Sequence, residues 1–376
     1  MNAVGIIFSS INEKSVYELT KQRTMASVPF GCRYRLIDFA LSNMVNSGIN
    51  HVGIVTHYNY QSLIDHIGSG KDWDLARRHG GIKILPPYIT AFANASNYLY
   101  STRLEALISI RDFISDCKED VVVLSDCDTV CNLDLQAMVD KHLETGADMT
   151  IAVKSSYVSQ DTTKSVTVVK SDENGKVTEV GDYAGLMSGF EDIYVRIMVL
   201  GRKYLEELIS DAIAHGYTSI TKDILVRNCK NHDIRTYNVD GYFATIRSLG
   251  DYFRCSMDLL DPEIRKSLFG NRTRPVFTKV RNSAPASYIN GAIVRNSLIA
   301  DGCVIQGTVE NSILFRGVKV GKNTHIKNSI IMQDTITGEN VYLNCVITDK
   351  NVVIRDGRVL SGHETRPFFI DKGSNV

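Results

Sequence analysis

The sequence lacks an excess of charge of either sign and any long apolar run. Its 42 Lys and Arg balance 42 Asp and Glu, so its charge does not favour nucleic acid as a partner. Its apolar runs are only a few residues long, as in Val121–Leu124, and none could span a bilayer. The first residues show neither the basic stretch nor the apolar segment of a signal peptide. We therefore expect no membrane association.

The sequence also lacks a CxxC pair and any Cys/His spacing typical of a zinc site, although it contains 8 cysteines. Scattered cysteines of this kind indicate reduced thiols, which predicts a cytoplasmic protein. The length of 376 residues suggests two or three domains, and 44% hydrophobic with 22% charged residues is ordinary for a globular chain.

Up to about residue 260, short β-branched runs alternate with longer amphipathic segments. The expected strands are Ala3–Phe8, Val52–Thr56, Val121–Ser125, Met149–Val153, Val166–Lys170 and Ile197–Leu200. The expected helices are Arg35–Ser47, Tyr60–Ile67, Leu104–Phe113, Leu135–Glu144 and Arg202–His215. This alternation predicts an α/β, Rossmann-like domain with a mostly parallel sheet, to which a turn at Asp172–Gly175 adds a hairpin.

From about residue 287 the sequence becomes repetitive. An Asn-Ser-apolar-apolar motif begins at Asn296, Asn311 and Asn328, and a related Asn-Cys motif begins at Asn344. Near-constant spacing of short β-branched faces and small polar corners predicts a parallel β-helix, the alternative being an irregular β-sandwich. The proline-containing stretch between the two patterns is expected to be a linker. The predicted domains are residues 1–260, 261–286 (linker) and 287–376.

These two patterns, and the motif Val28–Ile49 in particular, resemble glucose-1-phosphate adenylyltransferase, the ADP-glucose pyrophosphorylase family. Thr56–Tyr58, Ser62–Ile67 and Tyr252–Leu260 are similar to further segments of that family. The resemblance covers nearly the whole chain. It implies a nucleotidyltransferase domain followed by a left-handed parallel β-helix.

In this family the phosphate of glucose 1-phosphate attacks the α-phosphate of ATP and pyrophosphate leaves. Such a reaction needs donors around the leaving pyrophosphate, a divalent metal and cations that offset the charge of the transition state. The sequence departs from the family at these positions. The glycine-rich loop falls on Ser10–Val16, which contains no glycine, so its backbone cannot easily approach phosphates. The residues at the positions of the catalytic arginine, the following lysine, the sugar-phosphate lysine and the second metal carboxylate are Ser15, Met25, Tyr183 and Thr245.

The first metal carboxylate of the family corresponds to Asp128, since Asp134 then lies at the family's spacing. Asp128 could be a remnant metal ligand or a strand-end aspartate that caps its own turn. A single carboxylate is a poor site for a hard cation.

The sequence thus lacks the family's residues at five phosphate or metal positions. In this respect it resembles the non-catalytic, regulatory subunit of the two-gene bacterial type of the family. The resemblance implies no catalytic residue, no metal and no cofactor in this chain, with Mg²⁺ belonging to a catalytic partner in a heterotetramer. Self-association also remains open. One alternative is an active nucleotidyltransferase in which Lys14 or Lys21 replaces the missing cations. A weaker alternative is a β-helix acyltransferase that uses His325.

Several basic residues could contact an anion or effector. Arg23, Arg35 and Lys222 match family positions near phosphates, although for Arg35 we expect a structural ion pair with Asp38 or another neighbour. A basic group without acids follows at Arg272, Arg274, Lys279 and Arg281, which could receive a phosphorylated effector or be a solvated linker. Trp73 is expected to be a packing anchor and Cys127 a buried thiol.

Overall fold

The computed structural model describes residues 2–9, 13–87, 100–158, 166–183 and 188–376. The chain divides into two compact units. The first contains Met1–Ile11, Phe39–Tyr60 and Gly68–Phe243, and the second contains Asn12–Asp38, Gln61–Ile67 and Ala244–Val376. Two N-terminal segments therefore belong to the same unit as the C-terminal third of the chain. The boundaries at 260 and 286 mark changes in sequence pattern and stay a prediction.

The first unit is built on one mixed sheet with strand order β10-β9-β11-β6-β1-β4-β5, and β8 pairs with both β11 and β12. Its strands are β1 (Ala3–Phe8), β4 (His51–Val55), β5 (Gly81–Leu85), β6 (Val121–Asp126), β8 (Met149–Val158), β9 (Val166–Ser171), β10 (Val177–Tyr183), β11 (Gly189–Gly201) and β12 (Ile234–Asn238). β1 is parallel to β4 and β6, whereas β11 is antiparallel to β6 and β8. The expected hairpin is confirmed, because β9 and β10 pair antiparallel around Asp172–Gly175.

Helices pack on this sheet, and three of them contribute Leu104, Ile114 and Leu205 to a large apolar core. They are α2 (Leu36–Asn46), α4 (Arg103–Ser109), α5 (Arg111–Asp116), α6 (Leu135–Thr145) and α7 (Arg202–His215). The single helix expected at Leu104–Phe113 is wrong, because Ile110 leaves the helical conformation between α4 and α5. The Ser109 hydroxyl there donates to the carbonyl of Ala106, a local hydrogen bond that competes with helix continuation.

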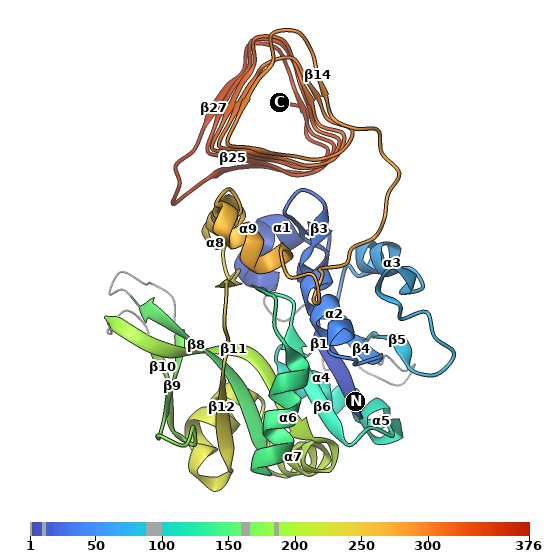
Figure 1. The fold of residues 1–376 in the computed structure, drawn as a ribbon, viewed down its shortest axis with the longest axis vertical. Helices are drawn as coiled ribbons and strands as arrows, with labels where there is room; N and C mark the ends of the chain where they lie inside the picture. Colours follow the sequence, from blue (N-terminus) through green and yellow to red (C-terminus); the bar gives the residue numbers. More distant parts are fainter. Residues whose placement is uncertain (1, 10–12, 88–99, 159–165, 184–187) are drawn as a thin grey trace. The chain divides into compact units, whose positions relative to one another are not determined.

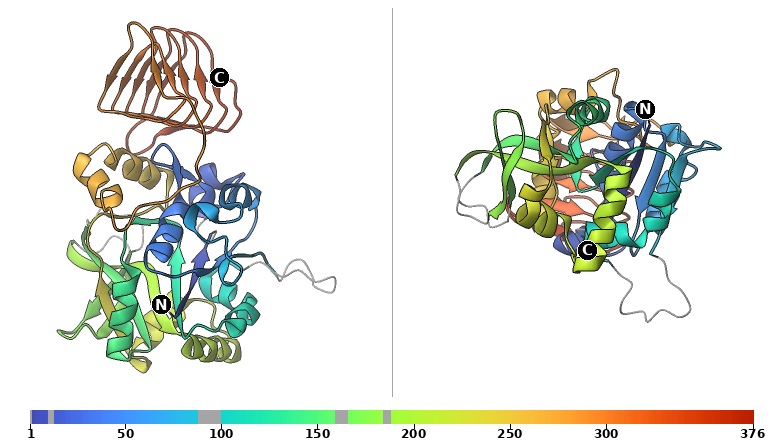
Figure 2. Two further views of the ribbon diagram at one scale, coloured as in Figure 1. Left: turned by 45° about the vertical axis from the view of Figure 1, so that its right-hand side comes forward. Right: turned by 90° about the horizontal axis from the view of Figure 1, so that it is seen from below.

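The second unit contains the predicted β-helix, with three short strands per coil. Its first face consists of β14 (Ser287–Tyr288), β17 (Val304–Ile305), β20 (Lys319–Val320), β23 (Ile336–Thr337) and β26 (Val353–Ile354). Its second face consists of β15 (Ile293–Arg295), β18 (Thr308–Glu310), β21 (His325–Lys327), β24 (Tyr342–Asn344) and β27 (Val359–Ser361). Its third face consists of β16 (Leu298–Ile299), β19 (Ile313–Leu314), β22 (Ile330–Ile331), β25 (Val346–Thr348) and β28 (Phe368–Ile370). Figure 1 looks along the coil and shows a triangle, and Figure 2 shows the coils stacked from the side.

Stacked side chains explain the repeated motif. The Asn296 amide donates to the side chain of Asn311, and each of these residues has a positive φ that few residue types other than glycine tolerate. One layer along, the Ser312 and Ser329 hydroxyls accept hydrogen bonds from the next coils. The fourth copy is offset by one residue from our alignment, because Ile347 pairs with Ile330 and Cys345 takes the positive-φ position.

The second unit also contains the segments around residues 12–38 and 61–67. Its other elements are η1 (Glu13–Val16), α1 (Tyr17–Thr20), η2 (Met25–Ser27), β2 (Pro29–Phe30), β3 (Tyr34–Arg35), α3 (Gln61–Ile67), α8 (Leu249–Asp258) and α9 (Pro262–Phe269). The Tyr252 hydroxyl on α8 donates to the Pro29 carbonyl across 2.8 Å, which joins α8 to β2. Among the described residues, no helix combines the length and apolarity needed to cross a bilayer.

The stretch expected to be a linker begins with a helix, which corrects that prediction. In α9, Asp261 is the N-cap and accepts a hydrogen bond from the backbone of Glu263, while Pro262 occupies the first turn. Asp-Pro-Glu is a helix-start signal, since proline at the first helical position loses no hydrogen bond. The prediction of a linker failed because Pro262 was taken to prevent a helix, whereas it occupies the first turn of one.

Candidate functional site

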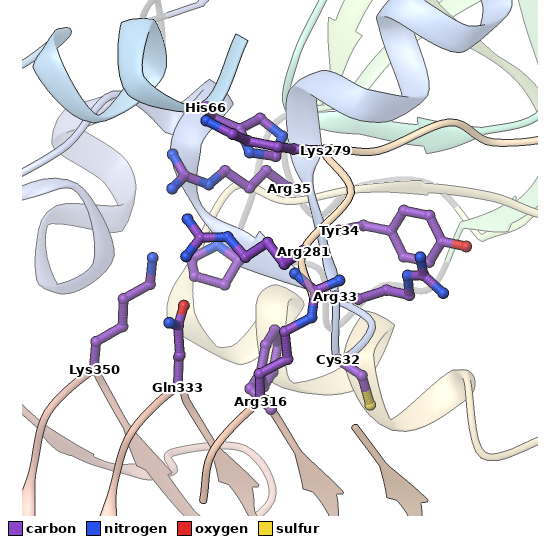
Figure 3. A pocket seen from close by; sticks show the side chains of 12 residues that line it. Cys32, Arg33, Tyr34, Arg35, His66, Lys279, Arg281, Arg316, Gln333 and Lys350 are labelled. Carbon is purple, nitrogen blue, oxygen red and sulfur yellow. The ribbon is translucent and has the colours of Figure 1, made fainter. Parts of the chain in front are cut away.

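A basic pocket lies within the second unit, lined by the β2–β3 segment, the end of α3, residues 279–281 and one corner of the β-helix (Figure 3). We call this the basic pocket; its lining residues are Pro29, Cys32, Arg33, Tyr34, Arg35, His66, Lys279, Arg281, Phe315, Arg316, Gln333 and Lys350. Six of these side chains are Lys or Arg, and none is Asp or Glu. An adjoining cavity of about 480 Å³ shares Lys279, Arg281, Arg316 and Gln333.

The β-helix contributes a column of residues from successive coils to this pocket. Arg316, Gln333 and Lys350 are spaced by the length of one coil, and backbone hydrogen bonds run from Asp334 to Arg316 and from Asn351 to Gln333. The same corner of three coils therefore presents two cations and one amide to one pocket.

Arg35 reaches the pocket from β3, but it does not form the expected ion pair with Asp38. Its guanidinium donates to the backbone carbonyl of Ser62 at 2.6 Å and to the Ser62 hydroxyl at 3.0 Å. Asp38 instead accepts the backbone N–H of Arg35 at 2.9 Å and pairs with His66 at 2.6 Å. Because Asp38 is engaged in this way, its carboxylate forms no direct ion pair with the Arg35 guanidinium, and the predicted pair is wrong.

The cations in the pocket disfavour one another. Burial, followed by the guanidiniums of Arg35 and Arg23, lowers the pKa of Lys350 to about 7. Burial also lowers the pKa of Arg35 to about 10, despite the nearby Asp38 carboxylate. A bound anion would relieve both effects, since an opposite charge favours the protonated form of each cation. This arrangement is suited to binding phosphate or sulfate groups.

We expect binding of sulfate to the basic pocket to take up protons near neutral pH. Without an anion, Lys350 is largely neutral above its pKa of about 7, and the bound charge should return it to the protonated state. Sulfate itself does not titrate there, so calorimetry in two buffers of different ionisation enthalpy measures the uptake. Affinity should fall as pH rises from 7 to 9. The variant Lys350→Met should lose the proton uptake and exposed Arg272→Ala should keep it; equal uptake in both variants would contradict this assignment.

Arg23, a predicted contact for a bound anion, forms an ion pair with the Asp349 carboxylate of the same chain. One of its terminal nitrogens lies 2.8 Å from both carboxylate oxygens of Asp349, and both side chains are buried. Lys222 is exposed in a π-helical turn of the first unit, η5 (Ile220–Val226), and so does not join the basic pocket. Within the predicted basic group, Lys279 and Arg281 line the pocket, whereas Arg272 and Arg274 do not.

The residues that differ from the family's catalytic pattern are distributed over both units. Ser15 is exposed in η1, Met25 is buried in η2, and Thr245 is half-buried in β13 (Phe243–Thr245). The Tyr183 hydroxyl on β10 donates to Glu179 at 3.3 Å. Residues 10–12 of the loop lie outside the described part of the chain. None of these side chains carries the positive charge or carboxylate that the family pattern has there.

Asp128 lies in the turn that follows β6, where its Oδ1 accepts a hydrogen bond from the Thr129 hydroxyl at 3.3 Å. It is 2% exposed, and its Oδ2 lies 3.2 Å from Nη1 of Arg196 on β11. Asp134 instead is the N-cap of α6 and accepts the backbone N–H of Ala137 at 3.1 Å. Cys127 and Trp73 are each 1% exposed, which confirms a buried thiol and a packing anchor.

The fold defines a nucleotidyltransferase domain joined to a hexapeptide-type β-helix. Residues 5–181 match the nucleotidyl transferase family, and residues 284–366 match the GlmU-like C-terminal hexapeptide family. The chain is 34% identical to the glycogen biosynthesis protein GlgD of Bacillus subtilis (strain 168), over 98% of this chain and 96% of that protein. It is 36% identical to the glycogen biosynthesis protein GlgD of Geobacillus stearothermophilus, over 99% of this chain and 96% of that protein. It is 32% identical to the glucose-1-phosphate adenylyltransferase of Halalkalibacterium halodurans, over 86% of this chain and 83% of that protein. The chain belongs to the ADP-glucose pyrophosphorylase family.

Proposed function

We propose that this chain is a catalytically silent, regulatory subunit of ADP-glucose pyrophosphorylase and modulates ADP-glucose synthesis for glycogen. The observation that carries the proposal is a contrast between two sites. The basic pocket gathers six cations for an anion, whereas the residues at the positions for phosphate, sugar phosphate and metal are Ser15, Met25, Tyr183 and Thr245. The likeness to two proteins named GlgD supports the same function.

The chemistry of the site argues against catalysis by this chain. A pyrophosphate leaving group needs preorganised positive charge, and its loss is costly because such donors act mainly on the transition state. Lys21, one candidate replacement, lies 3.6 Å from the exposed Asp371 carboxylate. We therefore assign no cofactor to this chain, and Mg²⁺ acts in a catalytic partner.

Regulation would operate through the basic pocket. Its walls come from segments separated by more than two hundred residues, from β2–β3 to the coil corner at Lys350. A phosphorylated effector that contacts both walls would favour one arrangement of the unit over another, and the partner would respond through the shared assembly. Because six of the side chains that line the pocket are Lys or Arg, the effector we propose is an anion.

The partner we propose is a catalytic subunit of the same family, in a heterotetramer. Related subunits tend to reuse one set of interfaces, which makes a mixed, pseudo-symmetric assembly straightforward. All eight cysteines are free thiols, which supports a reducing compartment such as the cytoplasm.

We expect this chain, coexpressed with a catalytic relative, to elute as one hetero-oligomer with an altered response to phosphorylated effectors. Light scattering measures the assembly, and steady-state kinetics with and without effector measures the response. The variant Arg281→Ala/Lys350→Met should keep the assembly and reduce the effector's influence by about 5-fold or more. Exposed Arg272→Ala, outside the pocket, is the matched control. Two separately eluting species, or an unchanged response in the pocket variant, would contradict the proposal.

A further inference from the structure

Two buried aspartates lie where strand β6 ends in the first unit. Asp126 is the last residue of β6 and Asp128 follows two residues later; they are 3% and 2% exposed. The family resemblance assigns a divalent metal to the position of Asp128. Buried carboxylates require a compensating cation, so the residues around this pair decide whether a metal fits.

The cation beside this pair is Arg196 on β11. Its Nη1 lies 3.2 Å from Oδ2 of Asp128 and 3.7 Å from Oδ2 of Asp126. The strand pairing brings Arg196 close to Asp126: β11 is antiparallel to β6 and their pairing ends with Ile197 opposite Ser125, so Arg196, which precedes Ile197, and Asp126, which follows Ser125, lie just beyond this last pair. The end of this pairing therefore places the Arg196 side chain beside the two carboxylates.

The backbone of Arg196 indicates that this position is imposed by its surroundings. Arg196 has a φ of 64°, in the left-handed region that is unfavourable for a long side chain. It lies where the pairing of β11 with β8 shifts between Tyr194 and Met198, so the strand bulges. Such strain persists where other contacts outweigh it, and the two carboxylates supply those contacts.

A second guanidinium closes the cluster. Nη1 of Arg103 lies 3.9 Å from Oδ2 of Asp126 and donates to the Tyr194 hydroxyl at 3.2 Å. Nη2 of Arg103 donates to Thr221 at 3.0 Å. Burial would lower the pKa of Arg103, but Asp126 and Tyr194 outweigh burial and raise it. Two arginines thus face two aspartates, so the formal charges of these four described side chains balance without a metal.

A divalent cation does not fit this arrangement. It would have to displace Arg196 from the carboxylate oxygens and would then lie beside two fixed positive charges. We propose that the guanidinium of Arg196 is the resident cation of the Asp126–Asp128 pair and keeps divalent metals out of it. This inference rests on the proposed function, because it names Arg196 as the residue that prevents metal binding in a chain that we propose to be catalytically inactive.

Titration of the full chain with Mn²⁺, followed by electron paramagnetic resonance of the free ion, tests the proposal. The wild-type chain should show no Mn²⁺ site that depends on Asp128. The variant Arg196→Gly removes the guanidinium and relieves the positive φ, so it should gain one site at least about 10-fold tighter than any wild-type binding. Adding Asp128→Asn to that variant should abolish the new site. Arg196→Lys, which retains a positive charge, should behave as the wild type does.

Arg196→Gln serves as a second neutral variant, because its side chain could keep a hydrogen bond and the fold if Arg196→Gly does not fold. Circular dichroism checks folding in each case. A wild-type Mn²⁺ site lost in Asp128→Asn would overturn the proposal, as would folded neutral variants that gain no site. A metal-binding wild-type chain without turnover would overturn this inference alone and leave the proposed function intact.

Discussion

Replacing Asp349 by alanine is expected to cost the chain about 3–5 kcal/mol of unfolding free energy. Asp349 and Arg23 form an ion pair with both carboxylate oxygens at 2.8 Å, and their side chains are 6% and 4% exposed. Without the carboxylate, Arg23 would remain buried as an unpaired charge near Lys350 and Arg35, which already disfavour one another. Urea unfolding of wild type and variant measures the loss.

The structure offers a matched control for this prediction. Lys21 and Asp371 lie 3.6 Å apart in the same unit, but their side chains are 47% and 57% exposed. Asp371→Ala should therefore cost only about 0–1 kcal/mol, because water solvates the remaining charge. The double variant Arg23→Leu/Asp349→Leu should recover most of the stability lost in Asp349→Ala, since it leaves no buried charge unpaired. Similar losses in Asp349→Ala and Asp371→Ala would contradict the account.

Sulfate adds a second readout for the Asp349→Ala variant. The anion can take the place of the missing carboxylate beside Arg23, so sulfate should stabilise the variant more than the wild type by mass action. Equal stabilisation of both chains would argue against an uncompensated charge at Arg23.

The regular elements of the fold were predictable because local sequence periods encode them. Helix α7 begins at Arg202 and ends at His215, as the helical period predicted, and β1 spans Ala3–Phe8 as expected. The β-helix followed from repeated Asn-Ser corners, whose positive φ angles and side-chain ladders are local requirements of each coil. The offset of the last copy was missed because Asn344 mimics the motif one residue before the true corner.

The basic pocket was only partly predictable. Arg35, Lys279 and Arg281 were named from the sequence, but Arg316 and Lys350 were not. The spacing of one coil between Arg316, Gln333 and Lys350 was a usable signal, since residues one coil apart stack at the same corner. The ion pair between Arg23 and Asp349, which makes Arg23 unavailable to a bound anion, was not predictable because the two residues lie 326 positions apart in the sequence.

The role of Arg196 was hidden for a different reason. It depends on an antiparallel register and a bulge, and an arginine at positive φ contradicts ordinary backbone preference. The sequence analysis singled out Asp128, yet Arg196, which forms an ion pair with it, lies on another strand. Departures from local rules of this kind are expected where a site has been altered.

The purified chain alone is expected to make ADP-glucose only at background level with Mg²⁺, ATP and glucose 1-phosphate. Removing one electrostatic donor typically costs ~10²–10³ in rate, and here the residues at four such positions are Ser15, Met25, Tyr183 and Thr245. The metal position is also neutralised by Arg196. A catalytic relative with its glycine-rich loop intact is the positive control.

The turnover of the isolated chain is therefore the most direct test of a silent subunit, measured as pyrophosphate released per chain. We predict background release, with Lys21→Ala and Asp128→Asn leaving it unchanged. Robust release by the wild-type chain that Asp128→Asn abolishes, with the fold retained, would contradict the account and make the chain a catalyst in its own right.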